Sequence, residues 1–248
     1  MTTQIDELHV YAEQNFGRHL LANSYPGRGI VVGRLESDPD EDLWVQVYWI
    51  MGRSENSRNR RFVVGGANDN ELRTEARDPA LVSDPTNIIY DAMLESPDLY
   101  YVSNGDHTHT IKDAIERSAR LEDALAVRER EDDAPNYTPR IAAMLDLRGL
   151  GELSFAILRA NAANHDETDR IVWRFPFPPP GLGYGITTYR HDGNPLPAFA
   201  GDPLWLPLTG SPEDVADTYW NALDHDNKIA LAVKAILDGA SRIILRQH

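Results

Sequence analysis

The chain contains no cysteine among its 248 residues. Disulfide bridges, cysteine-ligated metal sites and a thiol nucleophile are therefore excluded, as expected for a protein of a reducing compartment. Lysine is also scarce, because only Lys112, Lys228 and Lys234 occur among the 24 basic residues. An anion-binding site in this chain would therefore be built from arginine, whose planar guanidinium can hold an anion in bidentate geometry.

Long apolar runs and net positive charge are missing as well. No stretch approaches the roughly 20 apolar residues of a membrane-spanning helix, and residues 1–17 lack the apolar region of a signal peptide. The formal net charge of −15 at pH 7 opposes nucleic-acid binding, which needs a cationic surface along the phosphates. These features predict a soluble, cytoplasmic protein that binds neither nucleic acid nor membrane.

The first half of the chain predicts a helix followed by paired strands. Apolar residues at helical spacing indicate a helix over 7–22. Strand-like runs lie on either side of an acidic turn at 36–42, and further runs follow in pairs. The predicted strands are 29–35, 43–51, 61–66, 71–77, 87–94 and 99–105. Consecutive hairpins indicate antiparallel sheets rather than strand-helix-strand units.

The second half repeats this organisation. A helix is predicted over about 110–130, and the strand-like runs 140–147, 153–161, 170–175 and 185–191 then continue one sheet. Ser211 and Pro212 mark the start of a helix that extends to about Leu223. Residues 228–245 fit either a helix or a strand. The order of the elements predicts an α+β fold in which helices cover two antiparallel sheets.

Four arginines, Arg53, Arg58, Arg60 and Arg61, occur within nine positions of this acidic chain. They follow a strongly apolar strand and are predicted to lie in a turn, where backbone groups and guanidinium groups can hold an anion such as phosphate. The alternative is that they pair with some of the surplus carboxylates.

The segment VSNGDHTHTI at 102–111 joins a strand to the predicted helix, whose N-cap would be Thr108 or Thr110. His107 and His109 could bind a metal, but no third ligand presents itself. A histidine at the start of a helix is more often a hydrogen-bonded structural residue, and it can also contact substrate. No metal site is therefore predicted.

The segment REDDAPNYTPRI at 130–141 combines three acids with tyrosine, threonine and arginine. Carboxylates beside Tyr137 and Arg140 could act in general acid–base catalysis, because neighbouring charges tune their pKa values. The alternative is a solvated loop in which Asp133 or Asn136 caps a turn. Thr2 is a poor candidate for a nucleophile, because the predicted first helix separates it from the first strand.

Taken together, six segments resemble the stand-alone IMP cyclohydrolase family in the correct order. The most specific are VSNGDHT, similar to the family's V-S-N-G-x-H-T, and TPRIA. The other four are YPGRGIVVGR (25–34), GRSENSR (52–58), NIIYDAM (87–93) and TGSPEDVADTYWNAL (209–223). The resemblance implies a four-layer α-β-β-α sandwich like that of N-terminal nucleophile hydrolases, but without an N-terminal nucleophile. The single domain would span 25–248, after a helical extension at 1–24 that is expected to pack against a neighbouring subunit of a homo-oligomer.

The implied reaction closes 5-formamido-4-imidazolecarboxamide ribonucleotide to inosine monophosphate with loss of water, the last step of de novo purine biosynthesis. The reacting groups share one ring, so no metal or redox cofactor is needed, and the partner is a purine nucleotide. The resemblance and the chemistry together select catalytic and substrate-binding residues. The catalytic set is Arg53, Tyr90, Asp132, Asp133 and Arg140, with Glu131 an alternative to the two aspartates; the binding set is Arg28, Ser54, Arg58, Asn104, His107, Tyr137 and Thr138.

The resemblance assigns no role to Arg60 or Arg61, which are expected to neutralise nearby acids. The chain also departs from the family pattern at Ser57, Asp106 and His109. These departures leave two other functions open. One is a related enzyme acting on another amide-bearing nucleotide or nucleoside, and the other is a non-catalytic nucleotide-binding protein.

Overall fold

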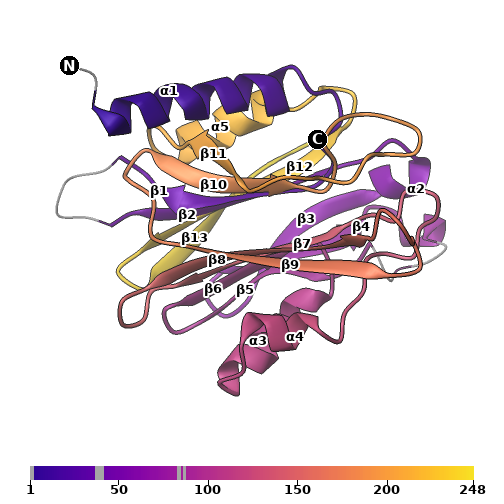
Figure 1. The fold of residues 1–248 in the computed structure, drawn as a ribbon, viewed down its shortest axis with the longest axis horizontal. Helices are drawn as coiled ribbons and strands as arrows, with labels where there is room; N and C mark the ends of the chain where they lie inside the picture. The colour runs from indigo at the N-terminus through magenta and orange to yellow at the C-terminus, as the bar shows by residue number, and fades with distance from the viewer. Residues whose placement is uncertain (1–2, 37–41, 83–84, 86–87) are drawn as a thin grey trace.

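The computed structural model describes residues 3–36, 42–82, 85 and 88–248. Two antiparallel sheets stack face to face, and helices cover both outer faces (Figure 1). This arrangement is the α-β-β-α sandwich that the sequence predicted. Most of the expected acidic turn and Thr2 lie outside the described residues.

The first sheet has six strands in the order β11-β10-β1-β2-β12-β13, and the second has seven in the order β3-β4-β5-β6-β7-β8-β9. In the first sheet these are β1 (Gly29–Arg34), β2 (Trp44–Met51), β10 (Leu182–Thr187), β11 (Leu204–Pro207), β12 (Lys228–Leu237) and β13 (Ala240–Gln247). In the second they are β3 (Arg60–Gly65), β4 (Glu71–Ala76), β5 (Asp91–Ser96), β6 (Leu99–Ser103), β7 (Arg140–Asp146), β8 (Glu152–Ala160) and β9 (Thr168–Phe175).

The helices form the outer layers. On the first sheet lie α1 (Gln4–Phe16), which continues into a π-helix (Gly17–Leu21), and α5 (Pro212–Ala222). On the second sheet lie α3 (His107–Glu116) and α4 (Leu121–Leu125). The short α2 (Glu55–Arg58) and a 3₁₀ turn (Pro79–Leu81) complete the set. Within the described ranges, no helix is both long and apolar enough to cross a membrane.

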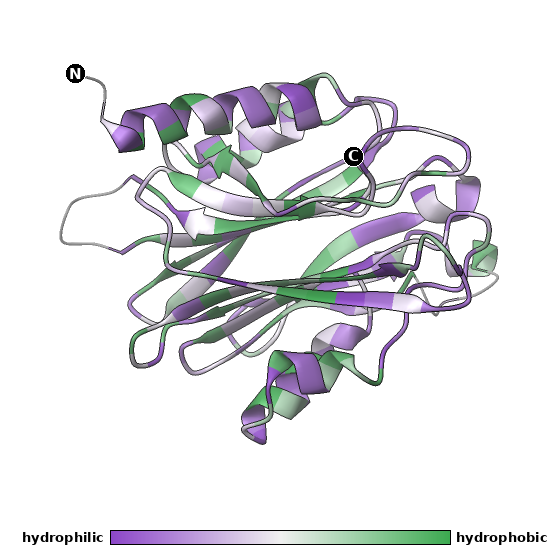
Figure 2. Ribbon diagram, viewed as in Figure 1, coloured by the Kyte–Doolittle hydropathy of each residue, from purple (hydrophilic) through white to green (hydrophobic). Residues whose placement is uncertain are grey.

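Three apolar layers hold the sandwich together. The layer between the sheets includes Tyr48, Phe62 and Phe155, all buried. The strand β2 is buried along its whole length, because one face packs against the second sheet and the other is covered by helices. Both faces of this strand therefore carry apolar side chains. In Figure 2 the hydrophobic residues, drawn in green, are frequent in the strands between the two helical layers. The remaining two layers lie between each sheet and its helices.

The N-terminal extension is part of this packing. Phe16 and Leu20 are buried in the same apolar layer as Trp49 and Tyr219, and the rings of Phe16 and Tyr219 meet edge to face at 5.1 Å. Thr3 caps the start of α1, and its backbone N–H donates in turn to the carboxylate of Asp6. Residues 4–21 therefore belong to the outer layer of the sandwich.

Four local expectations need correction. The predicted helix 110–130 is two short helices, because Ser118 has a positive φ of 62° that ends α3. The helix α3 begins at His107, so neither Thr108 nor Thr110 is its N-cap. The residues 170–175 and 185–191 do not share a sheet: β9 closes the second sheet and β10 lies in the first. Prolines between them lack the N–H that a strand ladder needs, so the chain crosses there.

The fourth correction concerns the arginine cluster, which is not a single turn: Arg53 precedes the short helix α2, Arg58 ends that helix, and Arg60 and Arg61 begin β3. The undecided segment 228–245 is a hairpin of β12 and β13. Asp238 and Gly239 both have positive φ, at 51° and 77°, as the tight turn between twisted strands requires. The helix predicted at 211–223 is confirmed, with Ser211 as its N-cap.

Candidate active site

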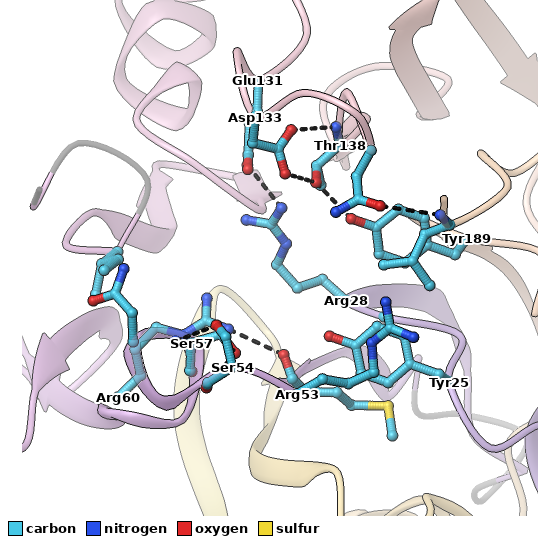
Figure 3. A pocket seen from close by; sticks show the side chains of 16 residues that line it. Tyr25, Arg28, Arg53, Ser54, Ser57, Arg60, Glu131, Asp133, Thr138 and Tyr189 are labelled. Carbon is cyan, nitrogen blue, oxygen red and sulfur yellow. Dashed lines mark hydrogen bonds and ion pairs between the residues drawn. The ribbon is translucent and has the colours of Figure 1, made fainter. Parts of the chain in front are cut away.

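A cavity of about 380 Å³ lies at one end of the sandwich. Its walls are formed where strands begin or end: the residues before β1, the end of β2, the start of β3, the loop before β7 and the residues after β10. Both sheets contribute, so residues far apart in sequence meet here (Figure 3). The volume is within the range of small-molecule sites.

Arg28 and Glu131 form the centre of one wall. Arg28 Nη2 lies 2.7 Å from Glu131 Oε1, and both side chains are almost fully buried. Arg28 Nη1 also donates to the backbone carbonyl of Asn104, at 3.0 Å. Burial raises the pKa of Glu131, because it disfavours the charged carboxylate more than Arg28 favours it. This carboxyl therefore holds its proton more readily than an exposed glutamate does.

Gly27 allows Arg28 to occupy this position. Its φ is +74°, and a Cβ at this residue would lie 2.1 Å from the Thr188 hydroxyl oxygen. Only glycine fits such a backbone beside such a neighbour. The glycine before the arginine in YPGR is thus explained by the geometry of the cavity wall.

A chain of hydroxyl groups lies beside the ion pair. The Thr138 N–H donates to Asp133 Oδ1 at 2.6 Å, and the Thr138 hydroxyl donates to Asp133 Oδ2. The hydroxyl of Tyr189 contacts Thr138 Oγ1, so it is the donor, because the single Thr138 proton is already committed. Figure 3 shows this chain of groups at the upper edge of the cavity. Burial raises the pKa of Tyr189, which therefore stays protonated at neutral pH.

Arg53, Ser54 and Ser57 line the opposite part of the cavity. The Arg53 guanidinium pairs with Asp192, donates to the carbonyl of Gly193 at 3.0 Å and lies 4.9 Å from the ring centre of Tyr25. Ser54 is the N-cap of α2, and its side chain accepts from the Ser57 N–H at 3.2 Å. This wall offers a guanidinium and two hydroxyl groups to a ligand.

The four arginines of the cluster do not have the positions expected from the sequence. Arg60 is buried and lines the cavity, where it donates to the carbonyls of Ser57 (2.7 Å) and Met51 (3.0 Å). Within the described residues it forms no ion pair, so the expectation that it neutralises an acid is wrong. Arg61 does pair with Glu75, at 3.2 Å. Arg58 is exposed and does not line the cavity.

The missed signal for Arg60 was strand alternation. In β3, Arg60 and Phe62 are buried whereas Arg61 between them is exposed. Side chains of a strand alternate between faces, so Arg60 shares the inner face with Phe62. The three acids are also separated: Glu131 and Asp133 line the cavity, whereas the side chain of Asp132 is 99% exposed.

Tyr90 and Asn104 lie behind the cavity wall. The hydroxyl of Tyr90 is 2.7 Å from that of Tyr48, and both are buried. Tyr48 was not singled out from the sequence, because an aromatic residue in an apolar strand is indistinguishable from core. The Asn104 side chain donates to the carbonyl of Pro139 (2.9 Å) and accepts from the Ile141 N–H (2.8 Å). Asn104 therefore fixes the loop that carries Thr138.

His107 and Arg140 form a buried group next to this loop. His107 Nε2 lies 3.1 Å from the carbonyl of Ile141, and Arg140 donates to Asp106 at 3.0 Å. Burial and the charge of Arg140 lower the pKa of His107 to about 3, so the ring is neutral at physiological pH. Neither residue lines the cavity.

Tyr137 is also outside the cavity, where its ring lies 4.3 Å from the Arg130 guanidinium. His109 pairs with Asp91 at 2.7 Å on the surface. Across the part of the chain that the structure describes, no group of three histidine, aspartate or glutamate residues is placed to hold a metal ion. The cavity thus unites Arg28, Arg53, Ser54, Asp133 and Thr138 of the predicted residues with Glu131, which was the alternative acid, and adds Arg60 and Tyr189.

The fold and the cavity together define a class of protein: a four-layer sandwich with a polar, arginine- and carboxylate-lined cavity at one end of its sheets. The family model for IMP cyclohydrolase-like proteins matches residues 25–240, so the chain belongs to that family. The family is one of cyclohydrolase-type enzymes. No curated protein matches the sequence significantly. Residues 1–24 lie before the family match.

Proposed function

We propose that this chain closes 5-formamido-4-imidazolecarboxamide ribonucleotide to inosine monophosphate with loss of water, the last step of de novo purine biosynthesis. The observation that carries the proposal is the division of one cavity into two walls. Arg53 and Arg60 stand with Ser54 and Ser57 on one wall, and Glu131 stands with Arg28 on the other. A phosphorylated substrate with a reactive amide requires both kinds of wall.

The arginine wall would bind the 5′-phosphate of the substrate. Arg60 has no carboxylate partner within the described residues, so its charge is available to an anion. A guanidinium already anchored to backbone carbonyls keeps its position and loses little rotamer freedom when an anion binds. The hydroxyl groups of Ser54 and Ser57 would complete the contacts.

The reaction then needs positioning and proton transfer. In the first step the carboxamide nitrogen bonds to the formyl carbon, and a proton passes from that nitrogen to the formyl oxygen. The product of this step is a cyclic carbinolamine. Holding the two groups in the reactive rotamer is a large part of the catalysis, because both belong to one molecule. Arg28 would stabilise the charge that develops on the formyl oxygen.

The second step is dehydration. The carbon–oxygen bond breaks and the hydroxyl group leaves as water with the proton of the former formamido nitrogen, which becomes the imine nitrogen of the new ring. Glu131 would carry these protons, since burial raises its pKa and so makes it a better proton acceptor than an ordinary carboxylate. The hydroxyls of Tyr189 and Thr138 offer a neutral donor chain beside it.

The proposal is tested with the purified chain and the formamido nucleotide. Ring closure changes the ultraviolet spectrum, and mass spectrometry identifies inosine monophosphate, 18 Da lighter than the substrate because one water is lost. Turnover to this product supports the proposal. Turnover only of another amide-bearing nucleotide or nucleoside would assign a related reaction, and saturable binding without turnover would assign a binding protein; either result overturns the proposal.

A further inference from the structure

A second cavity, of about 420 Å³, lies where the N-terminal extension meets the segment that follows β10. The π-helix and the residues after it supply one wall, including Arg18 and His19. Arg190 and His191 supply the facing wall. The first wall lies before the part of the chain that matches the family, so this cavity is built partly from residues outside the family domain.

The charge of this cavity is opposite to that of the chain. Two guanidinium groups, those of Arg18 and Arg190, line it, and no lining residue is acidic. Within the described residues neither arginine makes an ion pair, although twenty such pairs occur elsewhere. In a chain with a net charge of −15, two uncompensated guanidinium groups around one hollow form a local site for an anion.

The two walls are held together by a buried side chain. Asn23, which is 8% exposed, donates from Nδ2 to the carbonyl of His19 (3.1 Å) and to the carbonyl of Arg190 (3.0 Å). The N–H of Ala22 donates to the carbonyl of Gly17 at 2.9 Å, which closes the wide π-turn that carries Arg18. Turns of this kind are rare and frequently occur at functional sites. The cavity is therefore formed before any ligand arrives.

We propose that this second cavity binds a phosphomonoester, a small molecule that carries one phosphate on a larger, less polar body. Arg18 and Arg190, both exposed residues of the cavity wall, bind the phosphate, because a guanidinium group can hold phosphate oxygens in bidentate geometry. Burial and the charge of Arg18 lower the pKa of His19, so its ring is a neutral hydrogen-bonding group there. The side chains of Ala200 and Leu204 offer the less polar surface to the body of the ligand.

This site is separate from the proposed active site, and its assignment does not depend on the proposed reaction. The two cavities share no lining residue. They are neighbours along the chain, however, because Asp192, which follows His191, holds Arg53 of the first cavity. A ligand of the second cavity would therefore contact the segment that positions an arginine of the first.

The experiment is isothermal titration of the full chain with inosine monophosphate and, separately, with inosine, which lacks the phosphate. The variant Arg18→Ala/Arg190→Ala tests the second cavity. Arg117→Ala/Arg120→Ala, which removes two exposed arginines from the opposite helical layer, controls for the change in net charge. Arg60→Ala identifies any binding that belongs to the first cavity. Circular dichroism and thermal melting establish that each variant is folded.

We expect the wild type to bind one molecule of nucleotide per chain in the second cavity. In Arg18→Ala/Arg190→Ala this binding should be lost or at least tenfold weaker. The same binding must persist in Arg60→Ala and in the charge control, and inosine must not reproduce it. Equal stoichiometry and affinity in the wild type and Arg18→Ala/Arg190→Ala would overturn the proposal. Equal weakening in the charge control would also overturn it, since only the general field of the protein would then be involved.

Discussion

Arg28 and Glu131 form an ion pair whose atoms lie 2.7 Å apart, with side chains only 8% and 5% exposed. One residue precedes the first strand and the other lies in the loop before β7, so the pair also joins the two sheets at the cavity. Removing one member of such a pair leaves the other charge buried and unpaired. The pair therefore couples the proposed chemistry to the local structure.

Glu131→Gln is expected to reduce kcat by at least about a hundredfold, the usual range for loss of an acid–base group. The amide keeps the size of the side chain and can still accept a hydrogen bond from Arg28, so the fold should persist. Glu129→Gln is the matched control, because Glu129 pairs with Arg170 and its side chain is 62% exposed. Steady-state assays of both variants provide the comparison, and an equal, small effect in the two would remove Glu131 from the reaction.

The pH dependence of stability tests whether the pKa of Glu131 is raised in the folded state. Its pKa in the folded state is raised above the ordinary value of about 4.3, so the folded state holds the proton more tightly than the unfolded state. Stability from this group is therefore present below that ordinary value and is lost as the pH rises through the folded pKa. Urea denaturation across this window should show a smaller loss in Glu131→Gln than in the wild type. Identical slopes would contradict the assignment.

Arg60→Ala is expected to raise KM for a phosphorylated substrate at least about tenfold, equivalent to about 1.4 kcal/mol of binding. Arg61→Ala should change KM little, because Arg61 pairs with Glu75 away from the cavity. Arg58→Ala should also have little effect, because Arg58 is exposed outside the cavity. Steady-state kinetics of the three variants compare their KM values, and thermal melting must show that Arg60→Ala remains folded. A larger effect of Arg58→Ala would restore the role implied by the family resemblance.

Arg53→Ala is expected to lower turnover at least about tenfold, a loss of roughly 1.4 kcal/mol of transition-state stabilisation. Arg53 reaches the cavity from the start of the cluster and is held by Asp192. Asp192→Asn should reproduce part of this effect, since the guanidinium would lose its charged partner. Unchanged kinetics in a folded Arg53→Ala protein would exclude Arg53 from the site.

The sequence predicted the sandwich and part of the cavity lining, because the elements and the motifs that carry these residues are local patterns. Short, nearly continuous apolar runs define β2 and β7, and Ser211 with Pro212 marks the start of α5. The crossing between β9 and β10 was missed, because strand pairing depends on contacts between segments far apart in the chain. Tyr48 was missed for the same reason: its hydroxyl meets that of Tyr90 only after the sheets stack.

Thr138→Val is expected to lower kcat about tenfold or more, whereas Thr138→Ser should retain most activity. Valine removes the hydroxyl that links Tyr189 to Asp133, while serine keeps it. Both variants preserve the Thr138 backbone N–H, which donates to Asp133 at 2.6 Å. Comparison of kcat in the two variants isolates the hydroxyl. Equal activity would assign the hydroxyl chain to loop structure alone.

His107→Gln is expected to flatten the acid limb of the stability curve. The His107 pKa is about 3 in the folded state and about 6.5 in an unfolded chain, so only the unfolded state binds the proton between these values. Stability is therefore lost as the pH falls from about 6.5 towards 3. The full shift corresponds to an effect on the order of 5 kcal/mol.

Glutamine can still donate to the Ile141 carbonyl that His107 Nε2 contacts at 3.1 Å, but it does not titrate. The measurement is urea denaturation of wild type and His107→Gln between pH 4 and 7. The diagnostic quantity is the difference in slope, because Glu131 contributes in the opposite direction in the same window. Parallel curves for the two proteins would show that His107 titrates normally and is accessible to water. A reduced acid-side slope in the variant would establish that the folded protein holds this imidazole neutral between the second sheet and the loop before β7.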